Sequence, residues 1–268
     1  MDFAGLGMES IAIVVILFAV VAFFYSNLGL GGGQLYVPIM VLFLGFAMKD
    51  AVPLSLACAF VTMASATFTH SKKGLVDFRL GIQLAIAGII GVVGGVVFTL
   101  SAAEQVVKGA FATMLVLVAT KMMYDIYKGK KDNSASPTRF SSRLLIGGMG
   151  VSILTGFLIG SFGIGGGVVS VPLIVYVFKM EPRRAIGTSA LMGAILTPAA
   201  FVAYALNSGQ GVAIDYDLVL VLAPIVLVFA LIGSTWGLEK LRTKTVKTIF
   251  TCGVYLAATG MIYSLLFQ

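Results

Sequence analysis

The chain contains one glycine-rich motif twice, in the same register. Residues 29–33 are Gly-Leu-Gly-Gly-Gly, and residues 163–167, which lie 134 positions further along, are Gly-Ile-Gly-Gly-Gly. Each copy is followed by a valine–proline pair, at 37–38 and at 171–172. This duplication predicts two structurally related halves. In a duplicated membrane protein, matching glycine breaks in hydrophobic segments point to a shared binding site.

Long apolar runs separated by short charged patches dominate the sequence. Hydrophobic residues make up 59% of the 268 positions and charged residues 11%, whereas a soluble domain carries about a quarter charged residues. Runs of about 20 apolar residues are typical of membrane-spanning helices, and they lack the alternation of a membrane β-barrel. The pattern predicts ten apolar segments: 9–28, 34–48, 51–70, 79–101, 105–127, 142–162, 168–179, 184–206, 217–237 and 244–267.

Five of these segments precede a polar stretch and five follow it. The stretch, residues 128–141, is rich in lysine and serine, contains glycine and proline, and is predicted to be a linker. We therefore expect a first repeat at 1–127, a cytoplasmic linker at 128–141 and a second repeat at 142–268. Because five is odd, the second repeat must enter the membrane from the opposite side. The predicted fold is an all-α polytopic membrane protein with two inverted five-segment repeats.

The basic residues agree with this topology. When successive loops are assigned alternately to the two faces of a membrane, 16 of the 18 lysine and arginine residues fall on one face. Lys49 and Lys108 fall on the other face. Positively charged loops stay in the cytoplasm, so both termini are expected outside. No lysine or arginine precedes Lys49, and the first segment is therefore expected to be a true span rather than a signal peptide.

Two of the ten segments are too short to cross a bilayer. Segment 168–179 has 12 residues and segment 34–48 has 15. At 1.5 Å per residue they reach about 18 Å and 22 Å, against a hydrocarbon core of about 30 Å. Both begin at a triple glycine, so we expect each glycine turn to lie within the membrane and to open a short helix. Non-helical backbone at that depth is tolerated where it is buried in protein or lines a wet cavity.

Such turns are suited to binding an anion. The first N–H groups of a helix have no intrahelical partner and lie at the positive end of the helix dipole. Glycine also lets the backbone approach a ligand closely. The alternative role of such glycines is tight helix packing. This is the only role that we expect for Gly91, Gly95, Gly156 and Gly160. The predicted substrate-binding residues are Asn27, Gly31, Gly32, Gly33, Gln34, Ser55, Ser161, Gly165, Gly166, Gly167, Thr188 and Ser189.

Other classes of function find little support in the sequence. No His, Cys, Asp or Glu cluster has metal-ligand spacing, and the glycine turns lack the ending of a P-loop. We therefore expect no enzyme activity, no catalytic or metal-binding residue, no cofactor and no nucleic-acid partner. His70 ends a segment and is expected at the cytoplasmic interface. Cys58 and Cys252 lie within apolar runs and are expected to be buried thiols.

The motifs resemble those of the sulfite exporter TauE/SafE family, over essentially the whole chain. The residues that carry the resemblance are 27–38, 161–172, 185–189 (Ala-Ile-Gly-Thr-Ser) and 70–77 (His-Ser-Lys-Lys-Gly-Leu-Val-Asp). The resemblance implies a carrier in the prokaryotic inner membrane, with both termini then periplasmic. It also implies a small sulfur-containing anion as substrate: sulfite, thiosulfate, sulfoacetate or another organosulfonate. Residues 53–55 are Pro-Leu-Ser where 187–189 are Gly-Thr-Ser, so the two halves of the site are not expected to be identical.

The predicted function is secondary transport of such an anion by alternating access, with the anion held at the two glycine turns. Two alternatives stay open at this stage. An anion channel would use the same helix ends, and a membrane subunit of a larger complex would need partner chains. The expected partners are the small anionic substrate and the lipid bilayer, and a homodimer is compatible with the sequence.

Overall fold

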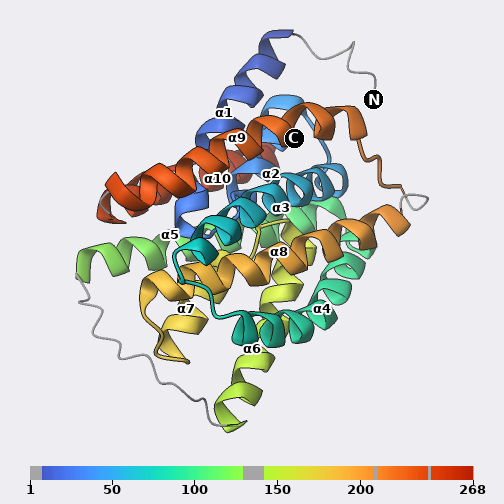
Figure 1. The fold of residues 1–268 in the computed structure, drawn as a ribbon. Helices are drawn as coiled ribbons and strands as arrows, with labels where there is room; N and C mark the ends of the chain where they lie inside the picture. The colour runs from blue at the N-terminus through green and yellow to red at the C-terminus, as the bar shows by residue number, and fades with distance from the viewer. Residues whose placement is uncertain (1–7, 129–141, 208–210, 241–242, 268) are drawn as a thin grey trace.

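Ten helices form the described part of the chain (Figure 1). The computed structural model describes residues 8–128, 142–207, 211–240 and 243–267. In chain order the helices are α1 (Met8–Leu28), α2 (Gly33–Leu44), α3 (Met48–Lys72), α4 (Phe78–Ser101), α5 (Glu104–Lys128), α6 (Ser142–Phe162), α7 (Gly167–Tyr176), α8 (Pro182–Leu206), α9 (Tyr216–Lys240) and α10 (Thr243–Phe267). The predicted all-α fold is confirmed. Of the predicted linker 128–141, the described residues include only Lys128.

Seven of the described helices are long and apolar enough to cross a membrane: α1, α3, α4, α5, α6, α8 and α9. The shorter apolar stretches are α2, α7 and residues 251–266 of α10. The chain is thus a multi-pass membrane protein. Helices α2 and α7, with 12 and 10 residues, are shorter than the segments predicted for them. They reach only about 18 Å and 15 Å at the rise of an α-helix.

Local sequence accounts for several helix boundaries. Gly32 and Gly166 precede α2 and α7 in the left-handed conformation, which glycine adopts without steric penalty. Pro182 opens α8 at a first-turn position, where its missing N–H leaves no bond unmade. The Asp77 carboxylate caps α4 by accepting a hydrogen bond from the Leu80 N–H at 3.0 Å.

Each of the main helix pairs consists of one helix that precedes residues 128–141 and one that follows them. Helix α4 packs along α6, α1 along α9, α3 along α8 and α5 along α10. Helix α3 also contacts α9, and α4 also contacts α8. In Figure 1, α1 begins at the upper edge of the molecule and α6 begins at the lower edge. These helix pairs mean that the first five helices pack mostly against the last five and not against one another.

The contact between α4 and α6 is a seam of glycines. The four glycines for which only packing was expected all lie on it: Gly91, Gly95, Gly156 and Gly160. A Cβ atom at Gly91 would overlap the carbonyl oxygen of Ile153, and one at Gly156 would overlap that of Gly88. Backbones approach this closely in membranes where small residues remove the intervening side chains. The predicted packing role of these glycines is confirmed.

The prediction for one of the two cysteines needs correction. Cys58 is buried as expected, but Cys252 on α10 is exposed. An apolar run in a membrane protein faces lipid as readily as protein, so hydrophobicity alone does not predict burial. His70 lies in the last turn of α3, where its side chain is fully buried and its Nδ1 lies 2.7 Å from the Ala66 carbonyl oxygen; its position at the cytoplasmic interface stays a prediction.

Candidate functional site: two glycine turns that meet

Two glycine turns, residues 29–33 and 163–167, meet in the interior, and together they are called the glycine centre below. Six of their glycines have φ between 60° and 90°: Gly29, Gly31, Gly32, Gly163, Gly165 and Gly166. These φ values are left-handed and disfavour a residue that carries a Cβ atom. The equivalent glycines of the two motifs thus adopt equivalent conformations. The repeated motif is a repeated backbone structure.

The two turns contact each other through their backbones. A Cβ built on Gly31 would lie 2.8 Å from the Cα of Gly165, and a Cβ built on Gly165 would lie 2.8 Å from the Cα of Gly31. A Cβ on Gly33 would overlap the Gly163 carbonyl, and one on Gly167 would overlap the Gly29 carbonyl. Each contact has its counterpart with the two turns exchanged. The predicted glycines Gly31, Gly33, Gly165 and Gly167 are brought together at this point.

The N-termini of two short helices lie at the glycine centre. In α2 the Gly32 carbonyl accepts bonds from the N–H groups of residues 35 and 36, at 2.9 Å and 3.0 Å. In α7 the Gly166 carbonyl accepts from residues 169 and 170, at 3.2 Å and 3.1 Å. The N–H groups one and two residues after each cap have no helical acceptor. Two positive helix ends therefore lie side by side, and an anion beside both would relieve their mutual repulsion.

Polar side chains converge on the second turn. Ser55 Oγ donates to the Gly163 carbonyl at 3.0 Å, and Gln34 Nε2 donates to the Ile164 carbonyl at 3.2 Å. Ser170 Oγ donates to the Gly166 carbonyl at 2.9 Å and lies 2.6 Å from Ser189 Oγ. Gln34, Ser55 and Ser189 are fully buried. Three side chains predicted for the site thus gather around residues 163–167, and their role in binding stays a prediction.

The first turn has mainly apolar neighbours. A Cβ on Gly31 would lie 3.0 Å from Met63 Cε, and one on Gly32 would lie 2.7 Å from the ring of Tyr36. Tyr36 is fully buried, stacks on Phe18 with ring centroids 4.4 Å apart, and shares a 3.2 Å hydrogen bond with the Thr62 hydroxyl. The two turns are alike in backbone but differ in the side chains around them.

Tyr36 and Thr62 are site neighbours that the sequence interpretation missed. The spacing contained a usable signal, because a side chain four residues after a helix cap lies back over that cap. Tyr36 stands four positions after Gly32 and covers it. The equivalent residue in the second copy is Ser170, which bonds to the Gly166 carbonyl instead.

Two predicted site residues, Ser161 and Thr188, form hydrogen bonds away from the two turns. Ser161 Oγ donates to the Gly95 carbonyl at 3.3 Å and so belongs to the α4–α6 seam. Thr188 Oγ1 accepts a hydrogen bond from the Asp77 N–H at 3.0 Å, which ties α8 to the loop between α3 and α4. Asn27 is buried in the last turn of α1, two residues before the first glycine turn. The helices that carry Ser161 and Thr188 were predicted, but the directions of these two side chains were not.

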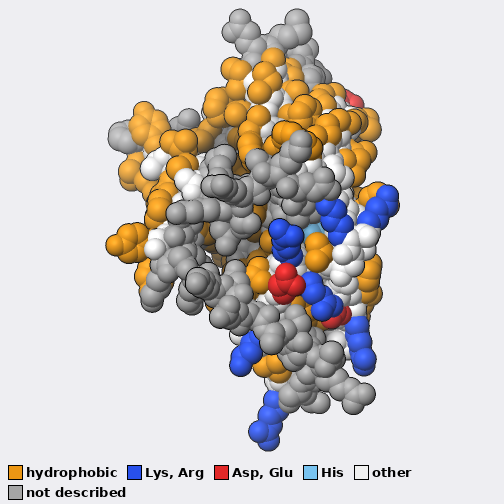
Figure 2. All heavy atoms as spheres, turned by 60° about the vertical axis from the view of Figure 1, so that its left-hand side comes forward, with side chains coloured by type: hydrophobic (Ala, Val, Ile, Leu, Met, Phe, Trp, Pro, Cys, Tyr) orange, Lys and Arg blue, Asp and Glu red, His pale blue; other side chains and the backbone are white. Residues whose placement is uncertain are grey.

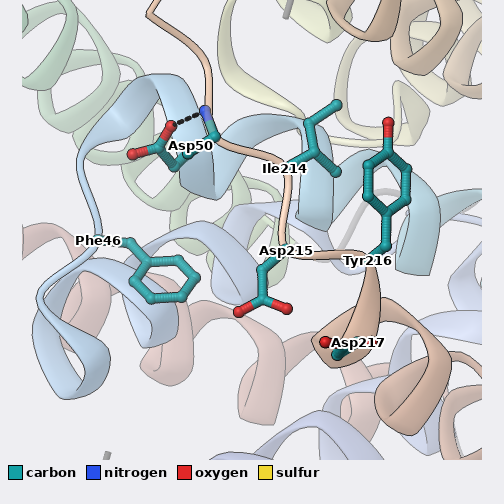
Figure 3. Close-up of a pocket in the computed structure, with 7 residues that line it drawn as sticks. Phe46, Asp50, Ile214, Asp215, Tyr216 and Asp217 are labelled. Atoms are coloured by element: carbon teal, nitrogen blue, oxygen red, sulfur yellow. Dashed lines mark hydrogen bonds between the residues drawn. The ribbon is translucent and has the colours of Figure 1, made fainter. Parts of the chain in front are cut away.

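A separate open pocket of about 360 Å³ lies between the start of α3 and the segment that enters α9 (Figure 3). Its lining residues are Phe46, Asp50, Ala213, Ile214, Asp215, Tyr216 and Asp217. Asp50 Oδ1 accepts a 2.7 Å hydrogen bond from the Ala213 N–H, and Asp215 Oδ1 caps α9 by accepting from the Leu218 N–H at 2.9 Å. Three carboxylates make this pocket unfavourable for an anion.

The comparisons with known proteins agree with a membrane transporter. "Probable membrane transporter protein YunE" of Bacillus subtilis is 24% identical over 97% of this chain and 100% of the relative. A "probable membrane transporter protein" of Haemophilus influenzae is 27% identical over 91% of this chain and 94% of the relative. One of Methanocaldococcus jannaschii is 24% identical over 82% of this chain and 80% of the relative. No solved structure matches the chain significantly.

The fold and these relatives define the class of the protein, a multi-pass membrane transporter rather than an enzyme. The model of the family "Sulfite exporter TauE/SafE" matches residues 14–261, and the chain belongs to this family.

Proposed function

We propose that the protein is a secondary transporter of a small sulfur-containing anion such as sulfite, thiosulfate, sulfoacetate or another organosulfonate. The anion is held at the glycine centre by the first N–H groups of α2 and α7, which have no intrahelical acceptor, and by the Ser189 hydroxyl, which turns from Ser170 toward the anion. The observation that carries the proposal is the meeting of two positive helix ends, with buried hydroxyl groups beside them, in a multi-pass membrane protein. The family description supplies the sulfur chemistry.

The proposal includes an inverted relation between residues 1–127 and 142–268. The reciprocal contacts of the two turns support it, as do the equivalent φ values of their glycines. Paired contacts elsewhere add to the support, since α4 packs on α6 as α1 packs on α9, and α3 packs on α9 as α8 packs on α4. A site between inverted halves is reached from one side of the membrane and then from the other as the two turns move apart.

The proposed topology puts both termini in the periplasm of a prokaryotic cell. Figure 2 shows lysine and arginine side chains gathered on one part of the surface, with hydrophobic side chains over much of the rest. Basic loops are retained in the cytoplasm. This basic side therefore faces the cytoplasm in the proposed orientation, and the pocket at Asp50 faces the periplasm.

Alkaline phosphatase fusions test this topology, since that reporter needs the oxidising periplasm to fold. A fusion after Gln268 is expected to be active, and a fusion at Gly74, in the loop between α3 and α4, is expected to be inactive. The opposite pattern would reverse the orientation.

Exchange of radiolabelled sulfite in proteoliposomes tests the function. Full-length protein should exchange external labelled sulfite for internal unlabelled sulfite in a saturable way. Thiosulfate and sulfoacetate should compete, and chloride should not. Saturable exchange favours the carrier, whereas unsaturated anion currents would favour a channel. Absence of exchange and binding for every sulfur anion would refute the proposed function.

Ser189→Ala is expected to weaken sulfite binding about tenfold. Because Ser170 Oγ donates to the Gly166 carbonyl, the Ser189 hydroxyl is the donor in its 2.6 Å bond to Ser170 Oγ. In the proposed complex this hydroxyl donates to the anion instead, and a hydrogen bond to a charged ligand contributes about 1.5–3 kcal/mol. The measurement is the sulfite concentration that gives half-maximal exchange. Ser71→Ala is the matched control, because the exposed Ser71 hydroxyl donates within its own helix, to the Phe68 carbonyl at 2.9 Å. Equal affinities in the two variants would remove Ser189 from the site.

A further inference from the structure

Gln34 has a fixed orientation at the glycine centre. It is the second residue of α2, it is fully buried, and its Nε2 donates to the Ile164 carbonyl oxygen at 3.2 Å. A backbone carbonyl can only accept a hydrogen bond, so the NH₂ side of the amide must face it. The reversed amide would place two acceptor oxygens against each other. The side-chain oxygen of Gln34 is therefore held on the other side of the amide, within a few ångströms of the second turn.

The Gln34 Oε1 atom has no hydrogen-bond partner within the described part of the chain, although it is buried. Buried side-chain acceptors are nearly always satisfied, and one that is not points to a missing donor. Gln34 belongs to the first turn of α2, where the first backbone N–H groups also have no intrahelical partner. Oε1 is thus a buried acceptor that lacks a donor, at a helix end whose N–H groups lack an intrahelical acceptor.

An anion whose oxygen atoms are all acceptors would fit the N–H groups but would repel Oε1. An anion that also carries a hydrogen on oxygen or nitrogen would satisfy both. This inference rests on the proposed function. We propose that the substrate is a monoanion that carries a hydrogen-bond donor of its own and donates a hydrogen bond to Gln34 Oε1. Two sources share this chemistry: the protonated form of an inorganic oxyanion, such as hydrogen sulfite, and a sulfonate that bears a hydroxyl or amino group.

This assignment has a consequence for coupling. With hydrogen sulfite as substrate, the proton crosses the membrane on the substrate itself. Each turnover then moves one proton with one sulfite, and no side chain of the protein has to carry the proton. The described intramembrane helices need no carboxylate relay for such transport.

The test uses full-length protein in liposomes, with sulfite exchange measured without any gradient. In the first arm, hydroxyethanesulfonate and propanesulfonate compete with labelled sulfite; both are permanent monoanions, and they differ by a hydroxyl group in place of a methyl group. Hydroxyethanesulfonate is expected to compete about tenfold better, which corresponds to about 1.4 kcal/mol. In the second arm, the apparent sulfite affinity should rise as the pH falls through the range in which sulfite takes up a proton, while the affinity for propanesulfonate stays constant.

Variants separate this role of Gln34 from a general loosening of the site. Gln34→Met keeps the length of the side chain but removes the acceptor, and it should abolish the preference in both arms. Ser55→Ala removes the neighbouring donor to the Gly163 carbonyl, so it should lower the affinity for all competitors and leave their ratio unchanged.

If hydroxyethanesulfonate competes better but the sulfite affinity does not depend on pH, the donor comes from a substituted sulfonate. If the sulfite affinity rises at low pH but the two sulfonates compete equally, the donor comes from the protonated oxyanion. Sulfite exchange that shows neither preference would overturn the inference and leave the proposed function standing, as would a Gln34→Met variant that keeps the wild-type preference. If no sulfur anion binds or exchanges at all, the proposed function fails and the inference fails with it.

Discussion

Gly33→Ala is expected to abolish anion exchange. Gly33 has an ordinary helical backbone, so alanine meets no strain in φ, but its Cβ would overlap the Gly163 carbonyl oxygen of the opposite turn. That oxygen belongs to a tight turn and also accepts the Ser55 hydroxyl, so it cannot shift without displacing the glycine centre. A single methyl group should therefore separate the two helix ends and lower the exchange rate at least about a hundredfold, because misplacement of binding groups by about 1 Å has effects of this size.

Gly147→Ala is the matched control for this experiment. It makes the same substitution in a membrane helix, and a Cβ at Gly147 has no neighbour within 4 Å. Both variants should insert and elute as single peaks after detergent extraction, and Gly147→Ala should exchange sulfite at the wild-type rate. Wild-type exchange by Gly33→Ala would show that contact between the turns is not required for transport.

Gly91→Ala is expected to destabilise the protein without touching the glycine centre. Its Cβ would overlap the Ile153 carbonyl and would approach the Phe157 N–H, so α4 and α6 would have to separate. Overpacking of a close contact costs about 1–3 kcal/mol and sometimes more. The variant should lose its monodisperse peak at a lower temperature than the wild type when detergent-solubilised protein is heated.

Gly94→Ala provides the comparison within the same helix. A Cβ at Gly94 would lie 3.7 Å from the Phe157 ring, which is an ordinary van der Waals contact. Gly94→Ala should therefore unfold at the wild-type temperature. If Gly91 and Gly94 variants were equally stable, the seam would be looser than the backbone contacts indicate.

The helices and the glycine turns could be predicted from the sequence because both depend on local patterns. Apolar length gives the spans, and a triple glycine opens a short helix at Gly32 and at Gly166. Which way a side chain points was not predictable in the same way. Most helices of this protein are apolar around their whole circumference, so hydrophobicity does not distinguish a face toward lipid from a face toward protein.

The candidate site shows this limit clearly. Gln34, Ser55 and Ser189 face the second turn, whereas Ser161 and Thr188 turn toward α4 and toward the α3–α4 loop. All five are small or polar residues in the expected segments. The partners that decide their direction, such as the Gly95 carbonyl and the Asp77 N–H, come from distant parts of the chain and are set by tertiary packing. Local propensity does not encode them.

The pairing of early helices with late ones has a consequence for synthesis. Helix α1 packs along α9, where a Cβ at Gly233 would overlap the Phe23 carbonyl, so the first helix meets its main neighbour only after most of the chain has been made. If synthesis stopped after the fifth helix, α1 and α4 would both lack the helices against which they mainly pack. Helix α4 gains its partner α6 in mid-chain, whereas the packing of α1 is completed only after α9 has been made.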